Sequence, residues 1–139
     1  FYLSGSPLNL SPQIYAFLDH QGFPLGSVSL KKWGIEDGDD NPLAQSHYKQ
    51  TQLREIFRTY PEKSFLLFGD SGEKDAEIYQ DIAQEFPGRV KAIFINNVTG
   101  ESANNPRFNQ VHLTQNSREA AQILVQMGLI TAEDLALIP

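Results

Sequence analysis

The chain has 139 residues, 40% of them hydrophobic, which is enough for one globular domain with its own core. Its 11 basic and 17 acidic residues give a net charge of −6, and this balance, with no basic stripe, excludes a protein held on nucleic acid by phosphate contacts. The absence of cysteine excludes disulfides, thiolate metal sites and cysteine nucleophiles. The sequence contains no run of about 18 apolar residues, so it predicts no transmembrane helix.

The first half of the chain predicts strands and helices in alternation. Residues 1–3 are apolar and are followed by a turn at residues 4–7, where serine, glycine and proline gather. Ser11 and Pro12 are typical of a helix start, and Ser46 is a good cap for a second helix that ends before Pro61. We therefore expect a strand at 1–3, a helix from 11 to about 21, a strand at 27–33, an acidic loop at 34–42 and a helix at 46–60.

The organising stretch of the sequence is residues 65–79. Residues 65–68 are four consecutive apolar residues, too few for a helix, and predict a strand buried on both faces. A glycine-rich turn at 69–72 follows, and the apolar positions of residues 73–86 have helical spacing. Ligands bind at the carboxyl ends of strands in open α/β sheets, so this turn is the best candidate site in the chain.

The rest of the chain continues the same alternation. We expect a buried strand at 90–95, a polar loop at 96–109, a short strand at 111–113 and helices at 117–127 and 131–137. Strands that alternate with helices predict a single α/β domain, with a parallel Rossmann-like sheet and helices on both faces.

Polar residues that suit phosphate chemistry fall at strand ends or near helix starts. Ser4 and the Gly5 amide could donate hydrogen bonds to an anion, and Lys49, predicted in the first turn of its helix, could place an ammonium at the same edge. Asp70 and Asp75 flank the glycine-rich turn and could hold a hard cation such as Mg²⁺ through oxygen ligands. Together these groups suit phosphoryl transfer, in which stabilisation of charge provides most of the catalysis.

Three stretches in this order resemble the catalytic domain of the actin-patch phosphatidate phosphatases. They are residues 1–7, Lys49 and residues 69–79, and the resemblance spans roughly residues 1–98. That family is a lipin-like branch of the haloacid dehalogenase superfamily. The resemblance implies a haloacid-dehalogenase-like fold and a Mg²⁺-dependent hydrolysis of a phosphomonoester, with phosphatidate at a membrane surface as the expected substrate.

The resemblance also implies a role for each matching residue. Ser4 matches the phosphate-binding serine or threonine of the superfamily, with the Gly5 amide beside it, and Lys49 matches the lysine that steadies the phosphoryl group and the nucleophile. Asp70 and Asp75 match the acidic motif that binds Mg²⁺. The sequence departs from the family at Asn96 and the residue after it, where members often have Arg-Asp.

The family's nucleophile motif, Asp-x-Asp-x-Thr, does not occur in this sequence. In the family this motif lies on a central strand of the sheet. Its two neighbouring strands correspond to the strands of this chain that end near Ser4 and Gly69. We therefore expect the chain to be an N-terminally incomplete piece of a longer protein, with the nucleophile strand upstream of Phe1 and a phospho-aspartyl intermediate formed there. This piece alone could be inactive.

Two alternatives stay open at the level of sequence. Residues 69–72, Gly-Asp-Ser-Gly, are close to the nucleophile elbow of α/β hydrolases, so Ser71 could be the nucleophile of a serine esterase with His112 as its base. The chain could also be a non-catalytic module that binds phosphate and Mg²⁺ without turning over a substrate.

Overall fold

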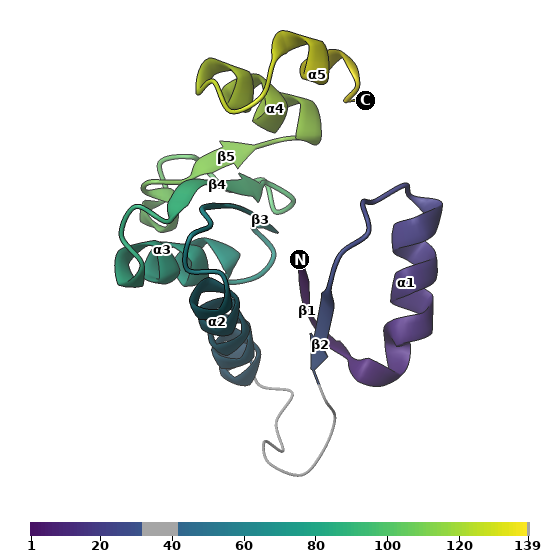
Figure 1. Ribbon diagram of the computed structural model, residues 1–139. Helices are drawn as coiled ribbons and strands as arrows, with labels where there is room; N and C mark the ends of the chain where they lie inside the picture. Colours follow the sequence, from purple (N-terminus) through teal and green to yellow (C-terminus); the bar gives the residue numbers. More distant parts are fainter. Residues whose placement is uncertain (32–41, 139) are drawn as a thin grey trace. The chain divides into compact units, whose positions relative to one another are not determined.

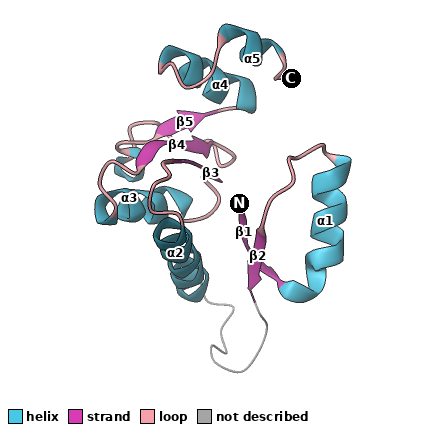
Figure 2. Cartoon of the chain, viewed as in Figure 1, coloured by secondary structure: helices cyan, strands magenta, loops and turns pink. Residues whose placement is uncertain are grey.

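A computed structural model describes residues 1–31 and 42–138 of the chain, and of residues 42–45 the backbone alone. The chain forms two compact units, Phe1–Pro61 and Glu62–Pro139, each of which is described by itself. Both units alternate strands with helices (Figures 1 and 2). The α/β class is therefore confirmed. The predicted acidic loop at 34–42 and the end of the predicted strand at 27–33 lie outside the described residues, apart from Pro42.

The first unit contains a parallel pair of strands. Strand β1 (Tyr2–Pro7) pairs with β2 (Val28–Lys31), in register up to Ser4 opposite Leu30, and the pairing then shifts before Pro7. Between the two strands lie a 3₁₀ turn, η1 (Leu8–Leu10), and helix α1 (Ser11–His20). Helix α2 (Pro42–Thr59) packs against β1.

Three boundaries in this unit differ from the prediction. Strand β1 continues through the predicted turn. Serine and glycine are common in turns, but they also suit the irregular strand pairing that the structure shows between Ser4 and Pro7. Ser11 is the first residue of α1 and makes no side-chain cap, which leaves Leu10 at the cap position. Helix α2 begins at Pro42, a residue suited to a first helical turn, so Ser46 lies inside the helix and Lys49 is not in its first turn.

The second unit contains a three-stranded sheet. Strands β3 (Phe65–Asp70), β4 (Val90–Asn96) and β5 (His112–Thr114) lie in the order β3-β4-β5, all parallel. Helix α3 (Asp75–Glu85) joins β3 to β4, and a loop with the turn η2 (Pro106–Phe108) leads to β5. Helices α4 (Ser117–Gln126) and α5 (Ala132–Ala136) follow, and the Thr131 side chain caps the start of α5.

Strand β4 forms the centre of the second unit's core. Ala92 and Phe94 cluster with Ala120 and Leu124 of α4 on one face of the sheet. Side chains alternate along a strand, so Ile93 and Ile95, both buried, face the other side, where α3 packs on β3 and β4. The expectation of helices on both faces is confirmed for this sheet, and the prediction of a buried strand at 90–95 is correct.

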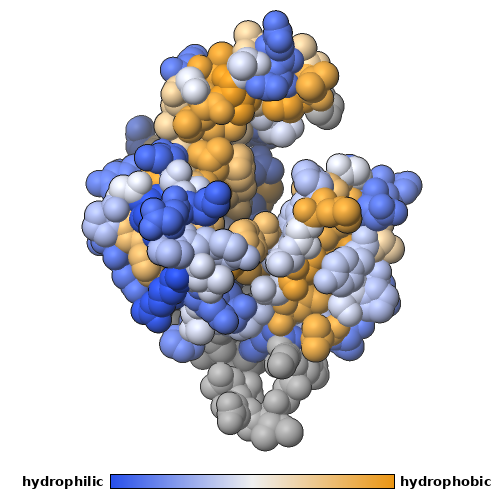
Figure 3. All heavy atoms as spheres, viewed as in Figure 1, coloured by the Kyte–Doolittle hydropathy of each residue, from blue (hydrophilic) through white to orange (hydrophobic). Residues whose placement is uncertain are grey.

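Strand β3 is less buried than predicted. The side chain of Phe68 stacks on Phe94 at 5.1 Å between ring centroids but is 55% exposed. β3 is an edge strand of its sheet, and the buried residues of α4 cluster with β4, so the prediction of burial on both faces is wrong for β3. Other exposed apolar residues lie on α1 and around α4 and α5 (Figure 3). Within residues 1–31 and 42–138, no helix has the length and apolarity to cross a bilayer.

Candidate active site

Asp70 and Asp75 meet at the carboxyl end of β3. Asp70 is the last residue of the strand and Asp75 the first of α3, and the turn of residues 71–74 joins them. The Asp70 backbone N–H donates to Asp75 Oδ2 at 3.3 Å, and Asp75 is 4% exposed. Asp70 Oδ1 accepts a hydrogen bond from the Gly72 N–H at 2.8 Å. The two aspartates predicted from the sequence are thus in contact at the predicted edge, through the backbone of Asp70 and the carboxylate of Asp75.

Gly69 makes this close approach possible. A Cβ atom at position 69 would lie 2.5 Å from both Cβ and Oδ2 of Asp75, closer than real Cβ contacts. Any other residue would therefore have to push the first turn of α3 away from β3. Gly72 has a milder version of the same constraint, because its Cβ would lie 3.0 Å from Asp70 Oδ1.

Side chains of α3 also cover the outer edge of β3. The Phe65 and Ser71 N–H groups point to β4, so alternation places the backbone groups of Phe68 and Asp70 on the edge away from β4. The Tyr79 hydroxyl donates to the Phe68 carbonyl at 2.9 Å, one helical turn beyond the contact of Asp75 with the Asp70 N–H. Asp75 and Tyr79 therefore cap two backbone groups that no strand of the described residues pairs with.

Tyr79 shows how negative this region is. Burial is the largest cause that raises the pKa of its phenol above the usual value, and three carboxylates raise it further: Asp75, Asp70 and Glu73. The phenol therefore stays protonated and remains a donor over the physiological range. Sequence reasoning treated Tyr79 only as an apolar helix position; its spacing of four residues from Asp75 was the available signal.

Ser71 is a buried structural residue of the turn. It is 2% exposed, and its hydroxyl contacts Asn97 Oδ1 at 3.4 Å and Thr99 Oγ1 at 2.6 Å. His112 instead stacks on Phe94 at 5.1 Å between ring centroids. The structure does not bring Ser71 and His112 together, so it gives the serine esterase alternative no base beside its nucleophile.

Ser4 and Lys49 lie in the first unit, on two elements that pack together. The Ser4 hydroxyl donates to Ser6 Oγ at 3.0 Å and accepts from the Ser6 N–H at 3.1 Å, where the β1–β2 pairing becomes irregular. Gly5 lies in the same irregular segment. Lys49 lies on α2 and is 7% exposed, unlike a solvated surface lysine. Because Asp70 and Asp75 belong to the other unit, the convergence of the four side chains stays a prediction.

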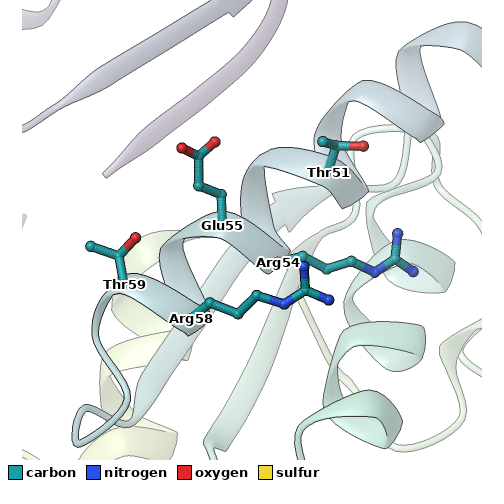
Figure 4. A pocket seen from close by; sticks show the side chains of 5 residues that line it. All are labelled: Thr51, Arg54, Glu55, Arg58 and Thr59. Carbon is teal, nitrogen blue, oxygen red and sulfur yellow. The ribbon is translucent and has the colours of Figure 1, made fainter.

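A pocket lies along α2. It is lined by Thr51, Arg54, Glu55, Arg58 and Thr59, with the two arginines extending to the same side of the helix (Figure 4). None of the residues predicted for the site lines it.

Two carboxylates are the metal-ligating set that the site offers. Within the described residues no group of three or more histidine, cysteine, aspartate or glutamate side chains could hold a metal ion. Mg²⁺ commonly binds one or two carboxylates and keeps water or substrate phosphate as its other ligands. Asp70 and Asp75 match this coordination preference of Mg²⁺. They do not match a structural zinc site, which needs four protein ligands.

Comparison with known proteins connects this geometry to a family. Residues 1–97 match the family model described as the catalytic domain of phosphatidate phosphatase APP1. The chain is 32% identical over 95 residues, 68% of its length, to phosphatidate phosphatase APP1 of Saccharomyces cerevisiae. It is 30% identical over 102 residues, 72% of its length, to an uncharacterized protein of Schizosaccharomyces pombe. The chain spans 16% of the length of each relative, and no solved structure matches it.

The contact at Gly69 predicts that Gly69→Ala destabilises the protein. The added methyl would overlap Asp75, and overpacking of this kind costs roughly 1–3 kcal/mol of unfolding free energy. Gly72→Ala is the matched control, because its methyl would meet the end of the Asp70 side chain at 3.0 Å and Val98 at an ordinary 3.5 Å, so we expect a smaller loss. Urea denaturation followed by circular dichroism measures both. Equal stability of Gly69→Ala and the wild type would show that α3 does not depend on this contact.

The edge cap predicts that Tyr79→Phe lowers the unfolding free energy by about 1 kcal/mol, the usual net value of one hydrogen bond. The folded pKa of Tyr79 is raised, so its contribution is complete below the unfolded value of about 10 and is lost as the pH rises toward the folded value. Tyr15→Phe is the control, because Tyr15 is 54% exposed. Denaturation midpoints that shift equally for both variants would contradict the cap.

Proposed function

The chain belongs to the family of the phosphatidate phosphatase APP1 catalytic domain, and from that membership we propose that it is part of a Mg²⁺-dependent phosphatase acting on a phosphomonoester. The observation on which the proposal depends is the pairing of Asp70 with Asp75 at the carboxyl end of β3, within the residues that match the family. Open parallel sheets bind their ligands at that edge.

We propose phosphatidate at a membrane surface as the substrate. The Saccharomyces cerevisiae relative is a phosphatidate phosphatase by name, and the matched residues include every predicted site residue of this chain. A phosphomonoester group is compact and doubly charged, so it requires donors and cations rather than a large apolar pocket. An exposed apolar residue such as Phe17 or Leu25 of the first unit is compatible with work at a lipid surface.

The metal would be held by Asp70 and Asp75. Asp70 uses Oδ1 for the Gly72 N–H, and its Oδ2 has no hydrogen bond within the described part of the chain, which leaves an oxygen for a cation. When bound, Mg²⁺ would neutralise phosphate charge and orient the phosphoryl group. The absence of a side chain at Gly69 would then serve the chemistry, because it lets the Asp75 carboxylate lie against the backbone of Asp70.

The chain's other predicted residues would act on the phosphate itself. Ser4 and the Gly5 amide would donate hydrogen bonds to phosphate oxygens. Lys49 would offset the negative charge that develops on those oxygens, and its burial would strengthen that interaction by excluding water. These donors are useful only if they approach the Asp70–Asp75 pair, which is the spatial condition of the proposal.

The nucleophile would come from a strand upstream of Phe1. Its aspartate oxygen would attack phosphorus in line, the bond from phosphorus to the leaving alcohol oxygen would break, and that oxygen would take a proton from a second aspartate. Water would then cleave the phospho-aspartyl bond and release inorganic phosphate. In the described residues β1 pairs only with β2, which leaves an edge that such a strand could join. The outer edge of β3 would be open to it only away from Phe68 and Asp70, whose backbone groups Tyr79 and Asp75 cap.

The metal role predicts that Asp70→Asn weakens Mg²⁺ binding with little change in folding stability. The amide oxygen can still accept from the Gly72 N–H, whereas the charge that attracts the cation is lost. We expect at least the ~10-fold loss of affinity typical of a lost outer-shell partner, measured by isothermal titration calorimetry. Glu133→Gln on exposed α5 is the matched control. An unchanged affinity for Asp70→Asn would remove Asp70 from the site.

The activity is tested by phosphate release from phosphatidate vesicles by the full-length protein, with and without Mg²⁺. We expect release that depends on Mg²⁺, on Asp70 and on an Asp-x-Asp-x-Thr motif encoded upstream of Phe1. Mg²⁺ binding without any release would favour the non-catalytic module. Release that persists in a chelator and is blocked by a serine-directed phosphonate would overturn the proposal in favour of the esterase.

A further inference from the structure

The loop between β4 and β5, residues 97–111, holds the turn that joins the two predicted metal ligands. We call residues 71–74 the ligand turn. The Thr99 N–H donates to Ser71 Oγ at 3.0 Å, at the start of that turn. Arg107 Nη1 donates to the Ser71 carbonyl at 3.3 Å, and its Nη2 donates to the Glu73 carbonyl at 2.6 Å. One guanidinium therefore binds two backbone carbonyls of the ligand turn.

The Arg107 side chain is itself fixed in place. Its Nη1 lies 2.9 Å from Glu101 Oε1, and its Nε and Nη2 each lie 3.1 Å from a carboxylate oxygen of Glu77. Its guanidinium carbon lies 5.2 Å from the centroid of the Phe108 ring. The backbone around it is also tied to α3, since Gln80 Nε2 donates to the Arg107 carbonyl at 2.8 Å. The side chain is 21% exposed, so these contacts lie in a partly dry environment.

We infer that Arg107 is a positioning residue for the metal site. Asp70 precedes the ligand turn and Asp75 follows it, so fixing the carbonyls of Ser71 and Glu73 fixes the spacing of the two carboxylates. Only a planar fork with several donors can bind these carbonyls and two carboxylates at once, which a lysine ammonium cannot reproduce. Arg107 lies outside residues 1–97, so the family match does not include it. The role at the metal depends on the proposed function; the clamp on the turn does not.

The direction in which removal of Arg107 changes the Mg²⁺ affinity distinguishes a positioning role from a purely electrostatic one. Removal of Arg107 deletes a positive charge and leaves Glu77 and Glu101 without their ion-pair partner. Coulomb attraction alone would then make Mg²⁺ bind more tightly. If Arg107 acts by holding the ligand turn, its removal makes Mg²⁺ bind more weakly.

The test compares Arg107→Met, Arg107→Lys and the wild type in the full-length protein. Hydrogen exchange without Mg²⁺ should become faster at the Asp70 and Gly72 amides in Arg107→Met, while β4 amides keep their protection. Mg²⁺ affinity by calorimetry should fall about 10- to 100-fold, the range for a lost outer-shell partner. Arg107→Lys keeps the positive charge and serves as the second variant if Arg107→Met fails to fold. It should also weaken Mg²⁺ binding. Arg118→Met is the control, because Arg118 is exposed and donates to the Ile138 carbonyl.

Each outcome bears on one claim. Unchanged exchange at the Asp70 and Gly72 amides in both Arg107 variants, or full wild-type affinity in Arg107→Lys, overturns the inference even if the enzyme is active. Tighter Mg²⁺ binding in Arg107→Met assigns the residue to charge balance and also overturns it. If the wild-type protein binds no Mg²⁺, the proposed function is wrong. Faster exchange in Arg107→Met would still establish that Arg107 holds the ligand turn.

Discussion

The contact between the end of β3 and the first turn of α3 determines the chemistry available to the second unit. Gly69 permits it, since the space that a Cβ would take is filled by Asp75. The same approach lets Asp75 accept from the Asp70 N–H and lets Tyr79 reach the Phe68 carbonyl. One missing side chain therefore lets the Asp75 carboxylate reach the backbone of Asp70 and lets side chains of α3 cap an exposed strand edge.

This arrangement gathers negative charge around the buried residues Asp75 and Tyr79. Asp75 is buried, and the raised pKa of Tyr79 reflects both burial and its carboxylate neighbours. A buried carboxylate beside another is costly unless donors or a cation compensate it. Backbone N–H groups at the turn supply part of that compensation, and a divalent cation would supply more. This electrostatic argument supports the proposed metal site and does not depend on similarity to other proteins.

The sequence determined the alternation of strands and helices, and hence the α/β class, because hydrophobic spacing directly reflects which face of an element is buried. It was less successful at boundaries. Ser46 has good capping chemistry, yet α2 begins at Pro42, because a capping side chain contributes only about 1 kcal/mol and cannot outweigh the rest of the helix. Phe68 is as apolar as its neighbours in sequence, and its exposure depends on which strand lies at the sheet edge.

The candidate site divides in the same way. The proximity of Asp70 and Asp75 was predictable from the sequence. A short glycine-rich turn between a strand and a helix keeps the last residue of the strand close to the first residue of the helix. Tyr79 as an edge cap, Ser71 as a partner of Thr99, and Arg107 as a clamp were decided only by the tertiary structure. Each of these contacts joins segments between 11 and 36 residues apart, and such pairings follow from how the chain folds back on itself, which local spacing does not encode.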